Sequence, residues 1–131
     1  MDKGTSALLK GYLEKSKDKL HVAEKLLQDG SFEDAASRAY YSAFHAVQAI
    51  LLTEGLSAVT HQGLVNLFGL HLIKTGKFDK KFGKYLVNLK DDREAGDYEV
   101  YSAIDRETAA NAVREAGEFL TAAEAYLKSF F

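Results

Sequence analysis

One helical segment combines a largely apolar surface with three polar side chains that could bind an anion. Over residues 38–52 the side chains are apolar or aromatic almost all the way round a helix. Arg38, Tyr41 and His45 are nevertheless spaced by three and four residues, so they share one face. This polar line could hold a phosphate or a nucleotide. The alternative for His45 is a core histidine that hydrogen-bonds to a neighbouring helix.

A second polar group lies near the end of a later predicted helix. Arg93 precedes Asp97 by four residues, so the two side chains could form an ion pair across the helix end. Arg93 could instead bind a phosphate, with Tyr98 stacking or hydrogen-bonding beside it. Just upstream, five lysines oppose one aspartate over residues 74–84, which indicates either solvated helix ends or a basic edge for phosphate. The lysines of this candidate basic edge are Lys77, Lys80, Lys81 and Lys84.

The sequence shows no pattern typical of a metal site or a catalytic nucleophile. The four histidines fall in three predicted helices, without a Glu-x-x-His motif or carboxylates spaced to join them. A Gly-rich phosphate loop and a nucleophile with a His–Asp pair are also missing from the sequence. We therefore expect no metal and no cofactor. His61 begins a predicted helix, whose dipole disfavours the protonated imidazole, and a capping or packing role is the simplest interpretation.

Composition favours a single water-soluble domain. The chain has 131 residues, of which 47% are hydrophobic and 27% charged, so it can build a core. A formal net charge of −2 gives no global argument for nucleic-acid binding. Without cysteine a disulfide framework is excluded, and we find neither a targeting segment nor a membrane span. We expect one domain over residues 1–131, in the cytoplasm and without membrane contact.

The hydrophobic periodicity predicts five helices and no strand. Ser31, Thr60, Asp79 and Asp105 are expected N-caps, and Gly96 is expected to end the fourth helix. The predicted fold class is all-α, an antiparallel up-and-down bundle with three long helices and two shorter ones. The expected helices cover residues 7–28, 32–54, 61–75, 80–95 and 106–128.

Four segments together resemble the HEPN domain family, and most of all its small stand-alone uncharacterised branch. The similarity extends over roughly residues 6–127 and implies an antiparallel helical bundle that forms a homodimer. Many members of the family are encoded beside a minimal nucleotidyltransferase and form a toxin–antitoxin pair, so the resemblance also implies such a partner. The segments are Ser37–Ala46, Thr60–Val65 with Phe68, Lys74–Lys77 and Arg93–Tyr98.

The resemblance also implies where a ribonuclease site would lie. Active HEPN ribonucleases use an Arg-x4–6-His motif, whose Arg binds the scissile phosphate and whose His assists proton transfer at the 2′-hydroxyl. Arg93 matches the Arg, but Tyr98 and Glu99 follow where the His is expected, and no His occurs after Arg93. A tyrosine hydroxyl is a poor general base at neutral pH. Arg38 and His45 match the motif only as a string, because they lie in the middle of an earlier helix.

We therefore expect a non-catalytic or weakly catalytic binding module. Its ligand would be a partner protein, RNA or a nucleotide. One alternative is a metal-independent ribonuclease that combines Arg93 with Tyr98 or His45. A purely structural interaction bundle is the other.

Overall fold

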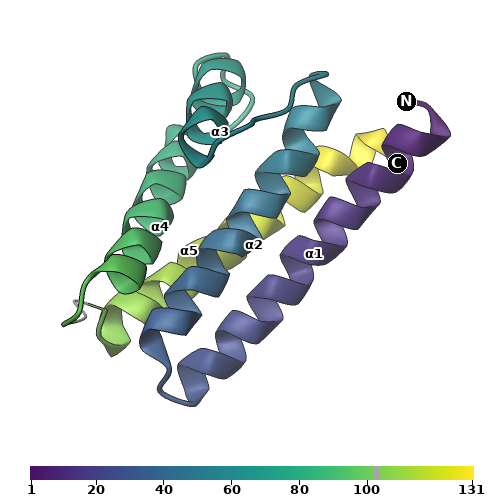
Figure 1. The fold of residues 1–131 in the computed structure, drawn as a ribbon. Coiled ribbons are helices and arrows are strands. Elements are labelled where there is room, and N and C mark those ends of the chain that lie inside the picture. Colours follow the sequence, from purple (N-terminus) through teal and green to yellow (C-terminus); the bar gives the residue numbers. More distant parts are fainter. Residues whose placement is uncertain (102–103) are drawn as a thin grey trace.

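The protein is a bundle of five α-helices, seen in a computed structural model that describes residues 1–101 and 104–131 (Figure 1). No strand occurs in these two stretches, which confirms the predicted all-α up-and-down bundle. A π-helix, Gly69–Ile73, continues α3, and a 3-10 turn, Lys128–Phe130, follows α5. The α-helices are α1 (Lys3–Gln28), α2 (Phe32–Thr53), α3 (His61–Phe68), α4 (Lys80–Tyr98) and α5 (Arg106–Leu127).

Helix α2 lies at the centre of the bundle. It contacts α1, α5, α4 and α3, and half of its 22 residues are buried. Small side chains such as Ala39, Ala43 and Ala46 are fully buried and allow the neighbouring helices to approach closely. The apolar circumference of α2 is therefore covered within one chain. It does not by itself require a second subunit.

Two serines join α1 to α2 inside the core. The Ser16 hydroxyl donates to the backbone carbonyl of Ser42 at 2.7 Å, and the Ser42 hydroxyl donates to the carbonyl of Ser16 at 2.9 Å. Both residues are fully buried. The exchange satisfies each buried hydroxyl and holds the two helices in one alignment.

Most of the expected helix caps are present. Ser31 occupies the N-cap position of α2 as expected, but its side chain makes no capping hydrogen bond. Helix α1 begins earlier than expected because Asp2 Oδ1 accepts a hydrogen bond from the Thr5 amide at 2.7 Å. The confirmed caps are Thr60 to the Gly63 amide, Asp79 to the Lys81 amide and Asp105 to the Thr108 amide.

Helices α3 and α4 differ from the expected lengths. The α3 segment changes to a π-helix after Phe68, and α4 runs on through Gly96 to Tyr98. Gly96 faces α2, because a Cβ placed there would lie 3.5 Å from Glu33 Cβ. This glycine therefore allows close packing and does not end the helix. The result is four long helices and one short one, where three and two were expected.

The ends of the chain lie near each other at one end of the bundle (Figure 1). Lys10 Nζ lies 5.7 Å from the centroid of the Phe131 ring. Among the described helices, none combines the length and the apolar character that crossing a membrane would need.

Candidate functional site

The packing of α4 on α2 places Arg93 over two aromatic rings. Arg93 Cζ lies 5.9 Å from the ring centroid of Tyr40 and 5.5 Å from that of Tyr41. A guanidinium over an aromatic face is attracted by the ring electrons. The Arg93 side chain is 18% exposed, so α2 fixes most of its length.

Arg93 also pairs with Asp97, but its terminal nitrogens make no hydrogen bond to another described residue. Arg93 Nε lies 3.1 Å from Asp97 Oδ2, which gives the ion pair expected from their spacing. Nε is buried, and its N–H is not aimed at the carboxylate well enough for a hydrogen bond. No residue in the described part of the chain accepts a hydrogen bond from Nη1 or Nη2. These two nitrogens could therefore bind an anion with two parallel hydrogen bonds.

His61 enters the same cluster from the first turn of α3. Its Nδ1 lies 2.6 Å from the Tyr40 hydroxyl. The His61 ring centroid lies 5.5 Å from that of Tyr40, 6.0 Å from that of Tyr41 and 4.9 Å from that of Phe44. Arg93 and His61 thus lie against the same two tyrosines. We call Tyr40, Tyr41, His61 and Arg93 the Arg93 cluster.

The surroundings of the cluster keep Tyr40 and His61 uncharged. Burial raises the pKa of Tyr40, and the neighbouring Tyr41 raises it further. Burial lowers the pKa of His61, and the positive charges of Arg93 and Lys90 lower it further. At neutral pH Tyr40 is therefore a neutral phenol and His61 a neutral imidazole, next to the guanidinium of Arg93.

The three residues of the polar line along α2 have different neighbours. Tyr41 belongs to the Arg93 cluster, whereas the Arg38 side chain is exposed and has no polar partner among the described residues. His45 Nδ1 pairs with Gln48 Oε1 at 2.7 Å, so its partner lies in the same helix and not in a neighbouring one.

The surroundings of His45 differ from those of His61. Burial lowers the pKa of His45, and Lys15 and Lys19 of α1 lower it further. His45 therefore lies toward α1, away from the positive charges on α4 that act on His61. The sequence selected His45 as the candidate, but the histidine that shares two tyrosines with Arg93 is His61.

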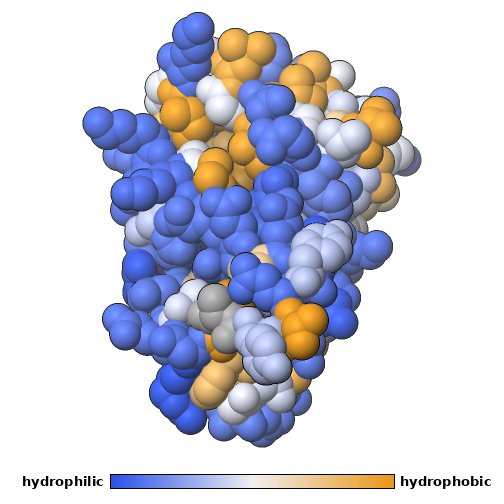
Figure 2. Space-filling view, turned by 60° about the vertical axis from the view of Figure 1, so that its left-hand side comes forward, coloured by the Kyte–Doolittle hydropathy of each residue, from blue (hydrophilic) through white to orange (hydrophobic). Residues whose placement is uncertain are grey.

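Tyr98 lies in the last turn of α4 and is 77% exposed. It makes no ring contact with the Arg93 cluster within the described part of the chain. Val100 and Tyr101, just after α4, are 92% and 91% exposed. Figure 2 shows a largely hydrophilic face, with hydrophobic residues gathered mainly toward one end. The end of α4 and the residues after it thus form an exposed segment outside the cluster, with two tyrosines and a valine: Tyr98, Val100 and Tyr101.

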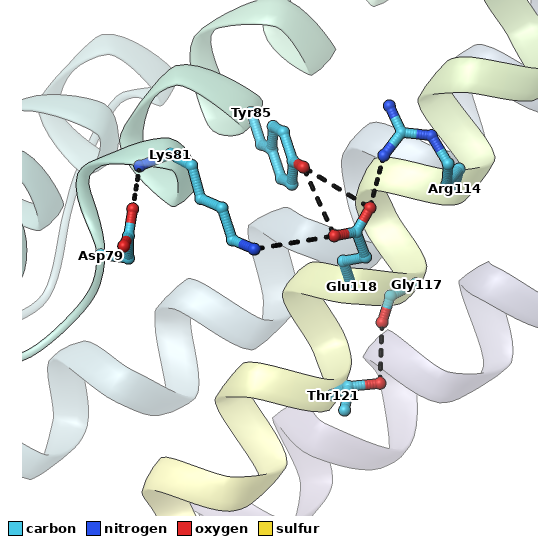
Figure 3. Close-up of polar contacts among 7 residues, drawn as sticks. All are labelled: Asp79, Lys81, Tyr85, Arg114, Gly117, Glu118 and Thr121. Carbon is cyan, nitrogen blue, oxygen red and sulfur yellow. Dashed lines mark hydrogen bonds and ion pairs between the residues drawn. The ribbon is translucent and has the colours of Figure 1, made fainter.

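The candidate basic edge is partly neutralised by other residues. Lys77 pairs with Glu54, and Lys81 Nζ lies 3.9 Å from Glu118 Oε1. Glu118 also pairs with Arg114 of its own helix and accepts a hydrogen bond from Tyr85 (Figure 3). The other two lysines of the edge, Lys80 and Lys84, are exposed and have no ion pair in the described stretches.

A separate acidic pocket of about 390 Å³ lies between α4 and α5. Burial raises the pKa of Asp92 in its wall to about 6, with Glu115 and Asp91 adding to the effect. Burial also raises the pKa of Glu115, and Asn88 Nδ2 donates to its carboxylate at 3.4 Å.

No group of three histidines or carboxylates that could hold a metal occurs in residues 1–101 and 104–131.

Several known proteins are similar in sequence to this chain. A UPF0332 protein of Thermotoga maritima is 34% identical over 110 residues, which cover 84% of this chain and 83% of that protein. "Putative toxin MJ0142" of Methanocaldococcus jannaschii is 31% identical over 121 residues, 92% of this chain and 82% of that protein. UPF0332 protein PH1297 of Pyrococcus horikoshii is 38% identical over 78 residues, 60% of this chain and 55% of that protein.

The fold recurs in the crystal structure of TT1696 from Thermus thermophilus. That structure is 20% identical, superposes with a TM-score of 0.76, and covers 91% of this chain and 98% of its own. The model of the HEPN domain matches residues 9–126. The resemblance of the four sequence segments is thereby confirmed, and the chain belongs to the HEPN domain family.

Proposed function

We propose that the chain is a toxin-like HEPN module that binds RNA through a phosphate group at Arg93, without a dedicated nuclease centre. The observation that carries this proposal is the state of the Arg93 guanidinium. Tyr40 and Tyr41 fix it from one side, and its terminal nitrogens have no protein acceptor among the described residues. The relative named as a toxin supports the toxin-like role.

The chemistry of this arrangement favours a phosphate ligand. An arginine that is already held by its neighbours loses little conformational freedom when it binds. Its planar fork fits two oxygens of a phosphodiester, which a lysine cannot match. Tyr41 is partly exposed and could stack on a base beside that phosphate. Lys80 and Lys84 remain available to strengthen binding through the RNA backbone.

Two observations weigh against the ribonuclease alternative. Tyr98 is exposed and lies outside the cluster, and His45 lies toward the lysines of α1. Neither residue therefore adjoins Arg93 as a proton-transfer group should. The purely structural alternative leaves the free donors of Arg93 without a role.

We further propose a homodimer and a protein partner, for which a minimal nucleotidyltransferase is the candidate that the family resemblance implies. The segment Tyr98–Tyr101 supports a contact of this kind, because it exposes two aromatic rings and a valine next to an acidic stretch. Its chemistry suits an apolar surface with a basic rim.

The test is the affinity for a fluorescently labelled single-stranded RNA, measured by anisotropy over a range of salt concentrations. Arg93→Ala should weaken binding by at least about tenfold, the value of one lost charge-assisted hydrogen bond. Arg93→Lys should restore only part of the affinity, because it keeps the charge and loses the fork. Arg93→Ala should also make binding less dependent on salt, because one phosphate contact is lost.

Arg114→Ala is the matched control. Arg114 also pairs with an acid four residues later, Glu118, and lies over a ring, 5.9 Å from the centroid of Tyr85. Both alanine variants thus lose an ion pair within one helix and a ring contact. Arg93→Ala should lower the midpoint of thermal unfolding more, because the Arg93 side chain is 18% exposed and that of Arg114 is 55% exposed, so RNA affinity is compared per folded molecule. Equal RNA affinity of the two variants would refute RNA binding at Arg93.

A further inference from the structure

We propose that His61 is a second phosphate-binding residue, held by Tyr40 as the tautomer with its hydrogen on Nε2, and that it binds the same RNA phosphate as Arg93. This inference rests on the proposed RNA binding at Arg93 and names a further residue of that site. His61 is absent from the residues that the sequence selected. The inference comes from a contact between α2 and α3.

The tautomer follows from the hydrogen-bond requirement of Tyr40. The Tyr40 side chain is fully buried, and its hydroxyl has a single polar contact within the described residues, His61 Nδ1 at 2.6 Å. A buried hydroxyl needs an acceptor for its hydrogen. If Nδ1 carried a hydrogen, the Tyr40 hydrogen would have none. Tyr40 therefore donates to the Nδ1 lone pair.

The neutral state of both groups completes this assignment. A neutral imidazole carries one hydrogen, on either Nδ1 or Nε2. The pKa of His61 is lowered by burial and by the charges of Arg93 and Lys90, so the ring is neutral at pH 7. The pKa of Tyr40 is raised by burial, so the phenol keeps its hydrogen. With Nδ1 occupied as an acceptor, the imidazole hydrogen lies on Nε2.

The Nε2–H group is left as an available donor. No described residue accepts a hydrogen bond from it, and the His61 side chain is only partly buried. The ring is anchored at Nδ1 by Tyr40 and packed on Phe44, with an angle of 30° between the two ring planes. His61 and Arg93 therefore both lie against the same tyrosine pair, and each has an N–H donor without an acceptor among the described residues. A phosphodiester has two non-bridging oxygens, each of which can accept from one or more of these donors.

This tautomer suits binding and not proton abstraction. A general base that removes a proton from a 2′-hydroxyl needs a lone pair directed at that hydroxyl. In the tautomer assigned here the lone pair of His61 is directed at Tyr40, and Nε2 can only donate. Binding of RNA without its cleavage is consistent with this arrangement.

Two substitutions test the roles of the two ring nitrogens of His61 separately. Asparagine places an acceptor near the position of Nδ1 and no donor near Nε2, whereas glutamine extends an amide N–H toward the position of Nε2. His61→Asn should keep the Tyr40 hydrogen bond and most of the stability, and should lose RNA affinity by about tenfold. His61→Gln should lose stability and keep RNA affinity within about threefold. Both variants lose the stacking on Phe44, so that loss cancels in the comparison.

The opposite ranking would overturn the inference. If His61 only packs and satisfies Tyr40, both variants will bind RNA as the wild type does per folded molecule, and His61→Gln will differ only by its lower stability. Loss of binding in both variants, with stability unchanged, would mean that an amide N–H near the position of Nε2 does not replace the assigned donor, and would also count against the inference. The RNA is the labelled single strand used to test Arg93.

A measurement on the free protein tests the tautomer without any ligand. Long-range ¹H–¹⁵N correlation spectra distinguish a ring protonated at Nε2 from one protonated at Nδ1. We expect the Nε2–H pattern for His61 at neutral pH, and a mixture of tautomers in Tyr40→Phe. An Nδ1–H pattern or an imidazolium in the wild type would refute the inference even if RNA binds at Arg93. Wild-type protein that binds no RNA would refute the proposed function and the phosphate role of His61 together.

Discussion

Replacing Asp92 with asparagine should stabilise the protein at neutral pH and make its stability less dependent on pH. Asp92 lines the pocket between α4 and α5, where burial and the carboxylates of Glu115 and Asp91 raise its pKa from 3.8 to about 6. The folded state therefore disfavours the charged form of Asp92. Ionisation of Asp92 therefore lowers the free energy of unfolding above about pH 6. Protonation of Asp92 restores that free energy as the pH falls below about 6.

The size of the effect follows from the shift. A rise of the pKa from 3.8 to about 6 corresponds to at most about 3 kcal/mol of destabilisation above neutral pH. Screening by water at this partly exposed side chain reduces the expected value to about 1–2 kcal/mol. Between about pH 7.5 and about pH 5 most of the wild-type Asp92 becomes protonated, so the advantage of asparagine should fall by about half.

The assay is equilibrium urea unfolding of the wild type and Asp92→Asn, followed by circular dichroism at these two pH values. The difference between the two proteins at each pH removes the contribution of the other carboxylates. Asp91→Asn is the matched control, because it removes the same charge from an exposed neighbour. We expect it to change the free energy of unfolding by less than about 0.5 kcal/mol.

Two results would refute the reasoning. One is an Asp92→Asn variant that is less stable than the wild type at about pH 7.5, which would mean that the carboxylate makes a favourable interaction that the pocket geometry does not reveal. The other is a gain of the same size at both pH values, which would assign the effect to packing rather than to ionisation.

The remaining predictions concern assembly and chemistry. Sedimentation velocity at micromolar concentration should show a homodimer, and a monomer at high protein concentration would contradict the proposed assembly. Incubation of structured and single-stranded RNA with the protein in EDTA should give no cleavage typical of a ribonuclease, because the assigned lone pair of His61 is directed at Tyr40, and neither Tyr98 nor His45 lies in the Arg93 cluster. Robust cleavage that Arg93→Ala abolishes would instead support the ribonuclease alternative.

Local sequence rules predicted the helices well where the structure depends on local contacts. Thr60, Asp79 and Asp105 were recognisable as caps because each bonds to an amide two or three residues along the chain. The end of α4 was predicted wrongly at Gly96, since that glycine serves the contact with Glu33 of α2. A contact between distant residues overrides a local signal of this kind.

The same distinction applies to the candidate site. The pairing of Arg93 with Asp97 lies within one helix turn and could be predicted from spacing. The stacking of Arg93 on Tyr40 and Tyr41, and the bond from Tyr40 to His61, join three helices. Helical periodicity describes one helix at a time, so it could not choose His61 over His45.

The reciprocal hydrogen bonds of Ser16 and Ser42 have a consequence for the order of folding. The other buried residues of α1 are two leucines and an alanine, whose apolar contacts are not directional and specify the alignment of the two helices less sharply. A shift by a single residue would break both bonds and leave two buried hydroxyls unpaired. The two residues are 26 positions apart, so α1 and α2 can find this alignment as a local hairpin. The tyrosines of α2 would then already be in position when α4 arrives with Arg93.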